Sequence, residues 1–188
     1  MLVILSACGY NNNDTVNNQS ENDSNNGQAE NNSDNDEAKE FYHVGETATI
    51  ESEIYGYSYE VTVNDYETTN DSESYPMDDF YGDYKEGDND RFLLISNVTI
   101  NNTSEEHFTP SKHIPMHVTE EGNESGEIVD LEKGFTEALK DVEPGESITG
   151  DMIATLQMTD NNPAKNYWLK FETLTDSETI WELPNTVK

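Results

Sequence analysis

Apolar and polar residues alternate along two stretches of this chain, and an alternation of period two permits few folds other than a β-sheet. In residues 56–64 one face carries four side chains: Tyr57, Tyr59, Val61 and Val63. In residues 91–101 one face carries Phe92, Leu94, Val98 and Ile100, while Leu93 and Ile95 begin the other. Because successive side chains of a strand point to opposite faces, we predict a half-buried strand at residues 56–64 and a central strand at residues 91–101.

Weaker strand patterns, separated by turn residues, fill the rest of the chain after residue 40. We predict strands at residues 45–52, 113–119, 147–157, 167–174 and 179–183. Pro115 cannot donate to a strand ladder, which favours a sheet edge for its segment. Residues 67–90 break the alternation and are predicted to form a long surface loop, and residues 131–139 a short helical turn. Seven or so short strands with scarcely any helical period predict an all-β fold, an antiparallel β-sandwich over residues 41–188.

A short motif near the start of the chain bears on where the protein is located. Leu5, Ser6, Ala7 and Cys8 place two small residues before the chain's one cysteine, an order that resembles the lipobox of bacterial lipoproteins. The resemblance implies that the thiol of Cys8 is alkylated with diacylglycerol and anchors the protein. We predict that residues 1–8 are a truncated lipoprotein signal and that the protein lies on the extracytoplasmic face of the cell membrane. The alternative is a chance match of four residues.

Residues 9–40 consist almost wholly of Asn, Asp, Glu, Ser, Gly and Gln. This composition buries too little apolar surface to offset the conformational entropy that folding removes, about 1–2 kcal/mol per residue. We predict a disordered linker that holds the domain away from the membrane. With one cysteine the chain forms no intramolecular disulfide, so the domain depends on its core alone.

The chain is strongly acidic, with 40 Asp and Glu against 9 Lys and Arg and a net charge of −31. Residues 9–40 hold eight of the acids and one of the bases, so about −24 remains on residues 41–188. Such a surface repels phosphate groups, which excludes nucleic acid as a partner. Salt screens repulsion between surface charges, so we hypothesise that the source is a salt-tolerant bacterium.

Several segments together resemble a known family. They are Val44-Gly45-Glu46-Thr47, residues 59–63, residues 91–95 with 98–102, Val142-Glu143-Pro144-Gly145-Glu146-Ser147, and Trp168-Leu169-Lys170-Phe171. Their order resembles the uncharacterised immunoglobulin-like (telokin-like) domain of Gram-positive lipoproteins, which is related in fold to a secreted mycobacterial immunoprotective antigen. The resemblance covers residues 44–174 and implies an immunoglobulin-like sandwich outside the cytoplasm. It implies no activity and no catalytic residues, and the long acidic loop before Arg91 departs from the family pattern.

That loop is the candidate metal site. It brings five carboxylates close together in sequence: Asp78, Asp79, Asp83, Asp88 and Asp90. Calcium takes six to eight oxygen ligands in flexible loops, which makes these residues Ca²⁺ candidates. The spacing does not fit an EF-hand. The alternative is a solvated acidic loop, and we expect no other cofactor.

Other chemistry has weaker support in the sequence. His113 and His117 are four residues apart in a segment predicted to be extended, which separates them by about 13 Å and is too far for a shared zinc ion. The chain lacks a Gly-x-Ser-x-Gly nucleophile elbow. A carboxylate pair for glycoside hydrolysis stays open, because such a pair is defined by distance across a cleft and not by sequence.

The ten tyrosines supply candidate contact residues, because a phenol ring offers contact area at low entropic cost. We assign Tyr57 and Tyr59 to the core face of their strand. The predicted exposed contacts are Tyr55, Tyr75, Tyr81 and Tyr84.

Taken together, these features favour a noncatalytic, membrane-anchored surface lipoprotein. Its sandwich domain is expected to bind another extracytoplasmic protein or a wall component through loops or a sheet edge. The first alternative is a lipoprotein that binds a divalent cation through residues 78–90. The second is a cell-wall hydrolase.

Overall fold

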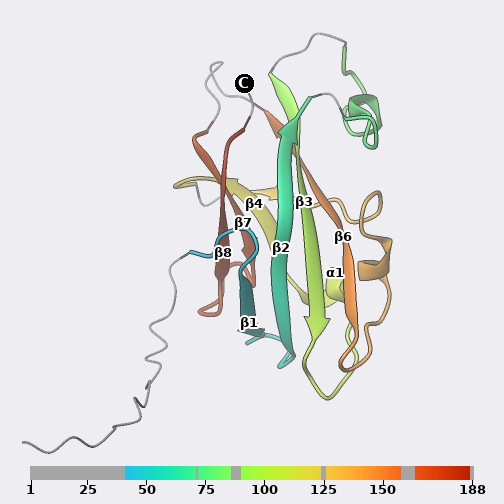
Figure 1. Cartoon of the computed structure of the whole chain (residues 1–188), viewed down its shortest axis with the longest axis vertical. Coiled ribbons are helices and arrows are strands. Elements are labelled where there is room, and N and C mark those ends of the chain that lie inside the picture. The colour runs from blue at the N-terminus through green and yellow to red at the C-terminus, as the bar shows by residue number, and fades with distance from the viewer. Residues whose placement is uncertain (1–40, 71, 86–89, 124–125, 158–163, 187–188) are drawn as a thin grey trace, which may run out of the picture. The chain divides into compact units, whose positions relative to one another are not determined.

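A computed structural model describes residues 41–70, 72–85, 90–123, 126–157 and 164–186. Cys8 and the predicted linker at residues 9–40 lie outside the described residues, so lipidation of Cys8 and disorder of the linker stay predictions. The regular secondary structure of the described part is nearly all β-strand, arranged in two sheets (Figure 1). Each sheet has four strands.

The two sheets are antiparallel throughout. The first has the order β1-β2-β3-β6, formed by β1 (Thr47–Glu51), β2 (Ser58–Thr69), β3 (Arg91–Asn102) and β6 (Ser147–Gln157). The second has the order β5-β4-β7-β8, formed by β5 (Glu127–Ile128), β4 (Met116–Glu120), β7 (Asn166–Phe171) and β8 (Thr179–Pro184). Three short helical segments complete the fold: η1 (Met77–Asp79), α1 (Pro110–His113) and η2 (Thr136–Leu139). This confirms the predicted all-β fold, an antiparallel β-sandwich.

The core lies between the sheets, where the inward faces of both are apolar. One row of buried side chains crosses the whole first sheet, because Ala48, Val61, Ile100 and Ile148 are successive register partners. The second sheet contributes Leu169, Phe171 and Trp181 to the same cluster. Burying each such side chain stabilises the fold by about 1.5–3 kcal/mol. The alternation in the sequence therefore predicted the inward face correctly.

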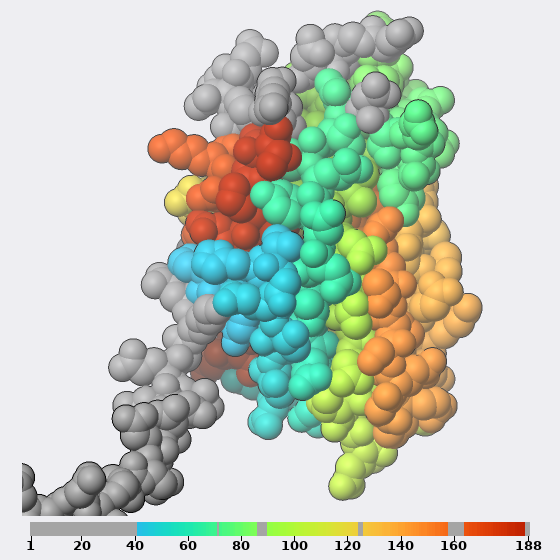
Figure 2. Space-filling view, in the orientation of Figure 1, coloured from blue at the N-terminus to red at the C-terminus, as the bar shows by residue number. Residues whose placement is uncertain are grey.

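Figure 2 shows the molecule from the side of the first sheet. One part of the outward face of this sheet is polar. Four threonines, Thr47, Thr62, Thr99 and Thr149, are register partners across its four strands. Their hydroxyls pair at 2.7 Å between Thr47 and Thr62, and at 2.8 Å between Thr99 and Thr149. Polar pairs of this kind stabilise a sheet face that contacts water.

Two strand predictions need correction. Strand β2 runs on to Thr69, past the predicted end at residue 64, through a register shift between Val63 and Asp65. A bulge inserts one residue and lets the strand continue pairing with β3. Residues 113–119 are not an edge strand, because β4 begins only at Met116 and lies between β5 and β7. Pro115 precedes β4 and therefore removes no ladder hydrogen bond.

The predicted surface loop at residues 67–90 is also corrected, because its described part packs against the protein. Leu93 and Ile95 of β3 and Ile153 of β6 point outward and are buried. Met77 covers them, with four half-buried aromatic rings around it: Tyr75, Phe80, Tyr81 and Tyr84. The loop thus forms a second, smaller apolar cluster on the outward face of the first sheet.

Candidate functional site

The outward face of the second sheet carries a cluster of polar and charged side chains. His117 of β4 is the register partner of Lys170 of β7, and Thr119 is the partner of Trp168. Their neighbours Val118 and Leu169 point into the core, so strand alternation turns these four side chains outward. The sheet therefore places residues distant in sequence side by side on one surface.

A cleft of about 590 Å³ opens on this surface. We call it the outer cleft, and it is lined by His117, Thr119, Gly126, Lys170, Thr173, Leu174 and Glu178. Its volume lies within the range of about 300–1,000 Å³ that is usual for ligand pockets. Five of its seven lining residues are polar or charged, and Leu174 is the one large apolar residue among them.

An ion pair crosses the outer cleft. The Lys170 ammonium lies 3.3 Å from Oε1 of Glu178, and it also lies over the Trp168 ring, 5.4 Å from the ring centre. The other oxygen of Glu178 accepts a hydrogen bond from the backbone N–H of Leu174 at 3.3 Å. The pair is therefore close to electrically neutral and ties β7 to the turn that follows it.

His117 contacts the far wall of the outer cleft. Its Nδ1 lies 3.1 Å from the hydroxyl of Thr173. Within the described part of the chain, its second ring nitrogen makes no hydrogen bond. His117 can therefore offer one further polar contact to a group that enters the outer cleft.

Two polar groups beside the outer cleft are buried without a partner in the described residues. They are the hydroxyl of Thr119, a residue only 3% exposed, and the indole N–H of Trp168. Gly126 passes directly over Thr119, because a Cβ at Gly126 would lie 2.7 Å from the Thr119 methyl carbon. An unpaired buried polar group costs about 1–3 kcal/mol. This wall of the outer cleft gains stability when an acceptor reaches it.

The turn after β7 is strained where it borders the outer cleft. Glu172 and Leu174 both have positive φ, at 51° and 67°. A non-glycine residue in this conformation costs of order 1–3 kcal/mol, and such residues cluster at ligand clamps. The backbone here holds Leu174 out into solvent, with 91% of its surface exposed.

A buried carboxylate fixes this turn in place. Glu172 is fully buried and accepts hydrogen bonds from the Tyr59 hydroxyl at 2.8 Å and the Ser52 hydroxyl at 3.1 Å. Burial and the charge of Glu172 raise the pKa of Tyr59 far above its usual range, so the phenol remains a donor. The anchor joins the end of β7 to the β1–β2 hairpin and so positions Thr173 and Leu174.

A second exposed aliphatic residue stands on the same surface. Ile128 of β5 is the register partner of His117 and is 78% exposed. Ile128, His117, Lys170 and Ile180 form one row across all four strands. The outer cleft is therefore bordered by apolar groups as well as by hydrogen-bond donors.

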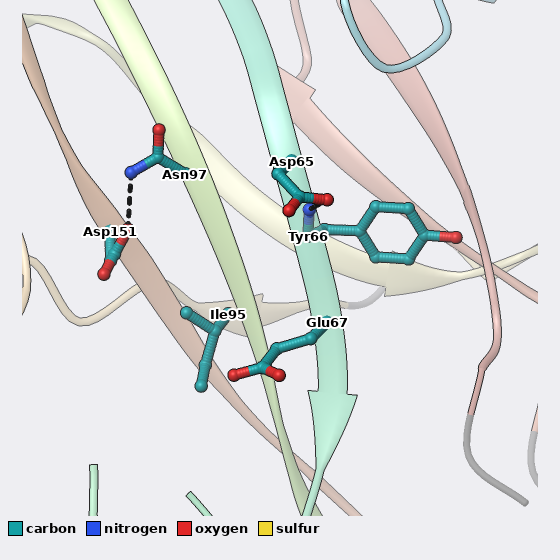
Figure 3. Close-up of a pocket in the computed structure, with 6 residues that line it drawn as sticks. All are labelled: Asp65, Tyr66, Glu67, Ile95, Asn97 and Asp151. Atoms are coloured by element: carbon teal, nitrogen blue, oxygen red, sulfur yellow. Dashed lines mark hydrogen bonds between the residues drawn. The ribbon is translucent and has the colours of Figure 1, made fainter. Parts of the chain in front are cut away.

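A smaller hollow of about 190 Å³ lies on the outward face of the first sheet (Figure 3). Asp65, Glu67, Ile95 and Asn97 line it with Asp151, while Tyr66 points away from the other side chains. Both oxygens of Asp151 are occupied, by Asn97 Nδ2 at 2.7 Å and by the Tyr75 hydroxyl at 2.7 Å. The Tyr75 bond attaches the loop after β2 to the sheet, and the Asn97 bond joins β3 to β6, so Asp151 has a structural role.

The structure describes four of the five calcium candidates. Asp78 and Asp79 are exposed in η1, while Asp83 forms a two-pronged pair with Arg91 at 2.6 and 3.3 Å. Arg91 lowers the pKa of Asp83. Asp90 accepts a hydrogen bond from Gln157 at 3.5 Å, and Asp88 lies outside the described residues. Among the residues described, no three His, Cys, Asp or Glu side chains converge on a metal position. Calcium binding by this loop stays a prediction.

The predicted exposure of the four contact tyrosines is correct for one of them and wrong for three. Tyr55 is exposed and meets the His113 ring edge-on at 5.1 Å. Tyr75, Tyr81 and Tyr84 were expected to be exposed but are half-buried over the second apolar cluster. Burial raises the pKa of Tyr75 and of Tyr81 to about 12. The two phenols donate to Asp151 and to the Leu156 carbonyl, which favours a packing role. A contact role for any of the four stays a prediction.

The strand tyrosines lie as predicted, whereas the two histidines do not share one extended segment. Tyr59 is buried in the core, and Tyr57 is half-buried and stacks on Phe108 at 5.1 Å. His113 ends α1 and His117 lies in β4, so they belong to different elements.

Within the described ranges, no helix has the length and apolar character of a membrane span.

Comparisons with known proteins give structural resemblances only. No protein-family model and no curated protein match the chain. Among solved structures, an uncharacterised β-sandwich protein from Clostridium difficile 630 is similar at 19% identity and a TM-score of 0.45, covering 78% of this chain and 96% of that one.

Two further structures are similar at the same level. One is the secreted protein MPT63 from Mycobacterium tuberculosis, at 12% identity and a TM-score of 0.42, covering 76% of this chain and 95% of that one. The other is a functionally unknown protein from Listeria monocytogenes EGD-e, at 13% identity and a TM-score of 0.44, covering 77% and 89%. These likenesses carry no function to this chain.

Proposed function

We propose that this protein is a membrane-anchored extracytoplasmic lipoprotein whose sandwich domain binds a partner, without catalysis, through the outer cleft. The observation that carries the proposal is that Leu174 and Thr119 line the same cleft, each in an unfavourable state. Leu174 is held in solvent on strained backbone, and the hydroxyl of Thr119 is buried beside it without a hydrogen bond in the described residues. The unpaired hydroxyl costs free energy in the isolated domain, and this cost falls when a partner supplies an acceptor. A partner that covers Leu174 also removes its exposed side chain from water.

The polar groups of the outer cleft are arranged for contact more than for chemistry. A hydroxyl against an imidazole, as in Thr173 and His117, is half of a nucleophile and base arrangement. A working triad also needs a third group that orients the imidazole through its other nitrogen. Among the described residues, no carboxylate contacts that nitrogen. Lys170 is likewise held by Glu178 and is not a free base.

Two features of the sequence support the proposed location. The segment Leu5-Ser6-Ala7-Cys8 has the residue types of a lipidation site, and the polar segment at residues 9–40 suits a spacer. One acyl chain holds a protein only marginally, whereas two hold it stably. We therefore expect Cys8→Ser to move the full chain from the membrane fraction to the soluble fraction. Retention of this variant in membranes would rule out the lipid anchor.

Photocrosslinking tests the outer cleft as the binding surface. A photoreactive phenylalanine is placed at residue 174 of the full chain in its own cells, and in a control at residue 54. Ile54 is a suitable control because it is also exposed, at 57%, but lies in the β1–β2 turn. We expect a discrete crosslinked product from residue 174 and none from residue 54. Crosslinking from residue 54 alone would place the binding surface elsewhere.

A further inference from the structure

We infer that the outer cleft takes an aliphatic side chain of a partner segment whose flanking residues are basic. The inference rests on the proposed function, because it names the chemistry of the partner that this surface fits. Three independent properties of the surface support it: its exposed apolar groups, its surplus of hydrogen-bond donors, and its charge.

The apolar property concerns Leu174 and Ile128. They are the two most exposed large hydrophobic residues of the described chain, at 91% and 78%. Leu174 lines the outer cleft, and Ile128 is the register partner of the lining residue His117. An aliphatic side chain of a partner that packs against Leu174 in the outer cleft removes apolar surface of both molecules from water.

The hydrogen-bonding property is a surplus of donors. The Lys170 ammonium has three N–H groups and uses one on Glu178. The Thr119 hydroxyl has no partner within the residues described. Both oxygens of Glu178 already accept a bond, from Lys170 and from the backbone of Leu174. A group that brings acceptors into the outer cleft meets these donors, and the carbonyl oxygens of an extended peptide do so without adding charge.

The charge of the protein decides the sign of the charge that its partner carries. Lys170 and Glu178 balance each other, so the outer cleft adds little charge of its own. Residues 41–188, which contain it, carry about −24. Such a field repels an anionic ligand and raises the association rate of a cationic one by about 10–10³-fold at low salt. It also disfavours a second copy of this chain, which carries the same charge.

Three short peptides, acetylated and amidated at their ends, test these properties on the full chain. They are Lys-Leu-Lys, Lys-Ser-Lys and Glu-Leu-Glu. Binding is followed by NMR, through the backbone amide signals of His117, Thr119 and Leu174. We expect Lys-Leu-Lys to bind about tenfold more tightly than Lys-Ser-Lys, because the leucine buries apolar surface. We expect Glu-Leu-Glu to bind more weakly than Lys-Leu-Lys at low salt, with the gap closing near 1 M NaCl, where screening acts over about 3 Å.

Matched variants assign the effect to the outer cleft. Leu174→Ser should remove the preference for leucine over serine, whereas Ile54→Ser should keep it. Equal binding of Lys-Leu-Lys and Lys-Ser-Lys would overturn the apolar part of the inference. Equal binding of the cationic and anionic leucine peptides at low salt would overturn the charge part.

The inference and the proposed function fail in different ways. If residue 174 crosslinks to a partner whose contact segment is acidic, the proposed function stands and the inference is overturned. If residue 174 crosslinks to nothing and residue 54 does, the proposed function fails, and a preference for Lys-Leu-Lys then reflects surface chemistry without a biological partner.

Discussion

Replacing Leu174 with glycine should leave the fold at least as stable as the natural protein while it weakens partner binding. The φ of Leu174 is 67°, a conformation that costs an L-residue about 1–2 kcal/mol. Glycine adopts it freely but loses more conformational entropy on folding, about 0.5–1 kcal/mol relative to alanine. Because 91% of Leu174 is exposed, little packing is lost. The free energy of unfolding should therefore rise by up to about 1 kcal/mol.

Urea and thermal unfolding of the full chain measure this change. A gain of about 1 kcal/mol corresponds to a rise in Tm of about 2–4 °C for a chain of this size. Leu174→Ala is the matched control, because it removes the same side chain but keeps a Cβ on the strained backbone. We expect the glycine variant to be more stable than the alanine variant by about 1 kcal/mol.

If Leu174→Ala is more stable than Leu174→Gly, the backbone at residue 174 is not strained. At an ordinary position glycine is less stable than alanine by about 0.5–1 kcal/mol. If Leu174→Gly shows that deficit, the turn after β7 is unstrained, and the backbone does not hold Leu174 out for a partner. Binding of the leucine peptide should weaken in both variants, because both lack the exposed side chain.

The remaining predictions concern the anchor of the turn, the second apolar cluster and the acidic surface. Tyr59→Phe removes a donor from the buried Glu172 carboxylate and should cost about 1.5–3 kcal/mol, seen as a lower urea midpoint, whereas an unchanged midpoint would show that the anchor is dispensable. The pKa of Tyr75 is raised to about 12, so the folded state retains this proton longer than the unfolded state. Its contribution is complete below pH 10 and is lost as the pH rises towards 12. Tyr75→Phe should therefore flatten the loss of stability over that interval in alkaline unfolding curves, and identical curves would contradict it. The net charge of −31 predicts that Tm rises with NaCl up to about 1 M, and a flat or falling curve would speak against self-repulsion.

The sequence predicted the strands because their signal is local. Alternation at residues 91–101 placed Phe92 and Leu94 inward, and it also left Leu93 and Ile95 apolar on the opposite face. The apolar side chains on that second face indicated that another segment of the chain covers β3. The loop with Met77 supplies the cover, but its sequence is rich in acids and Gly, which suggested a solvated loop.

The outer cleft was harder to predict. His117 and Lys170 alternate with buried neighbours, so their outward direction follows from the strand period. Their proximity depends on the pairing of β4 with β7, which joins segments about fifty residues apart. No local sequence pattern predicts which strands pair over that separation. The positive φ of Leu174 also has no sequence signal, because leucine is not a residue that favours it.

The decisive measurement is hydrogen–deuterium exchange of the full chain, with and without the partner captured by crosslinking. We expect slower exchange in the partner's presence at the backbone amides of Thr119, Thr173 and Leu174, which line the outer cleft. The amides of Thr62 and Thr99, on the outward face of the other sheet, should exchange at unchanged rates. Protection at Thr62 and Thr99 with none at Leu174 would contradict the account.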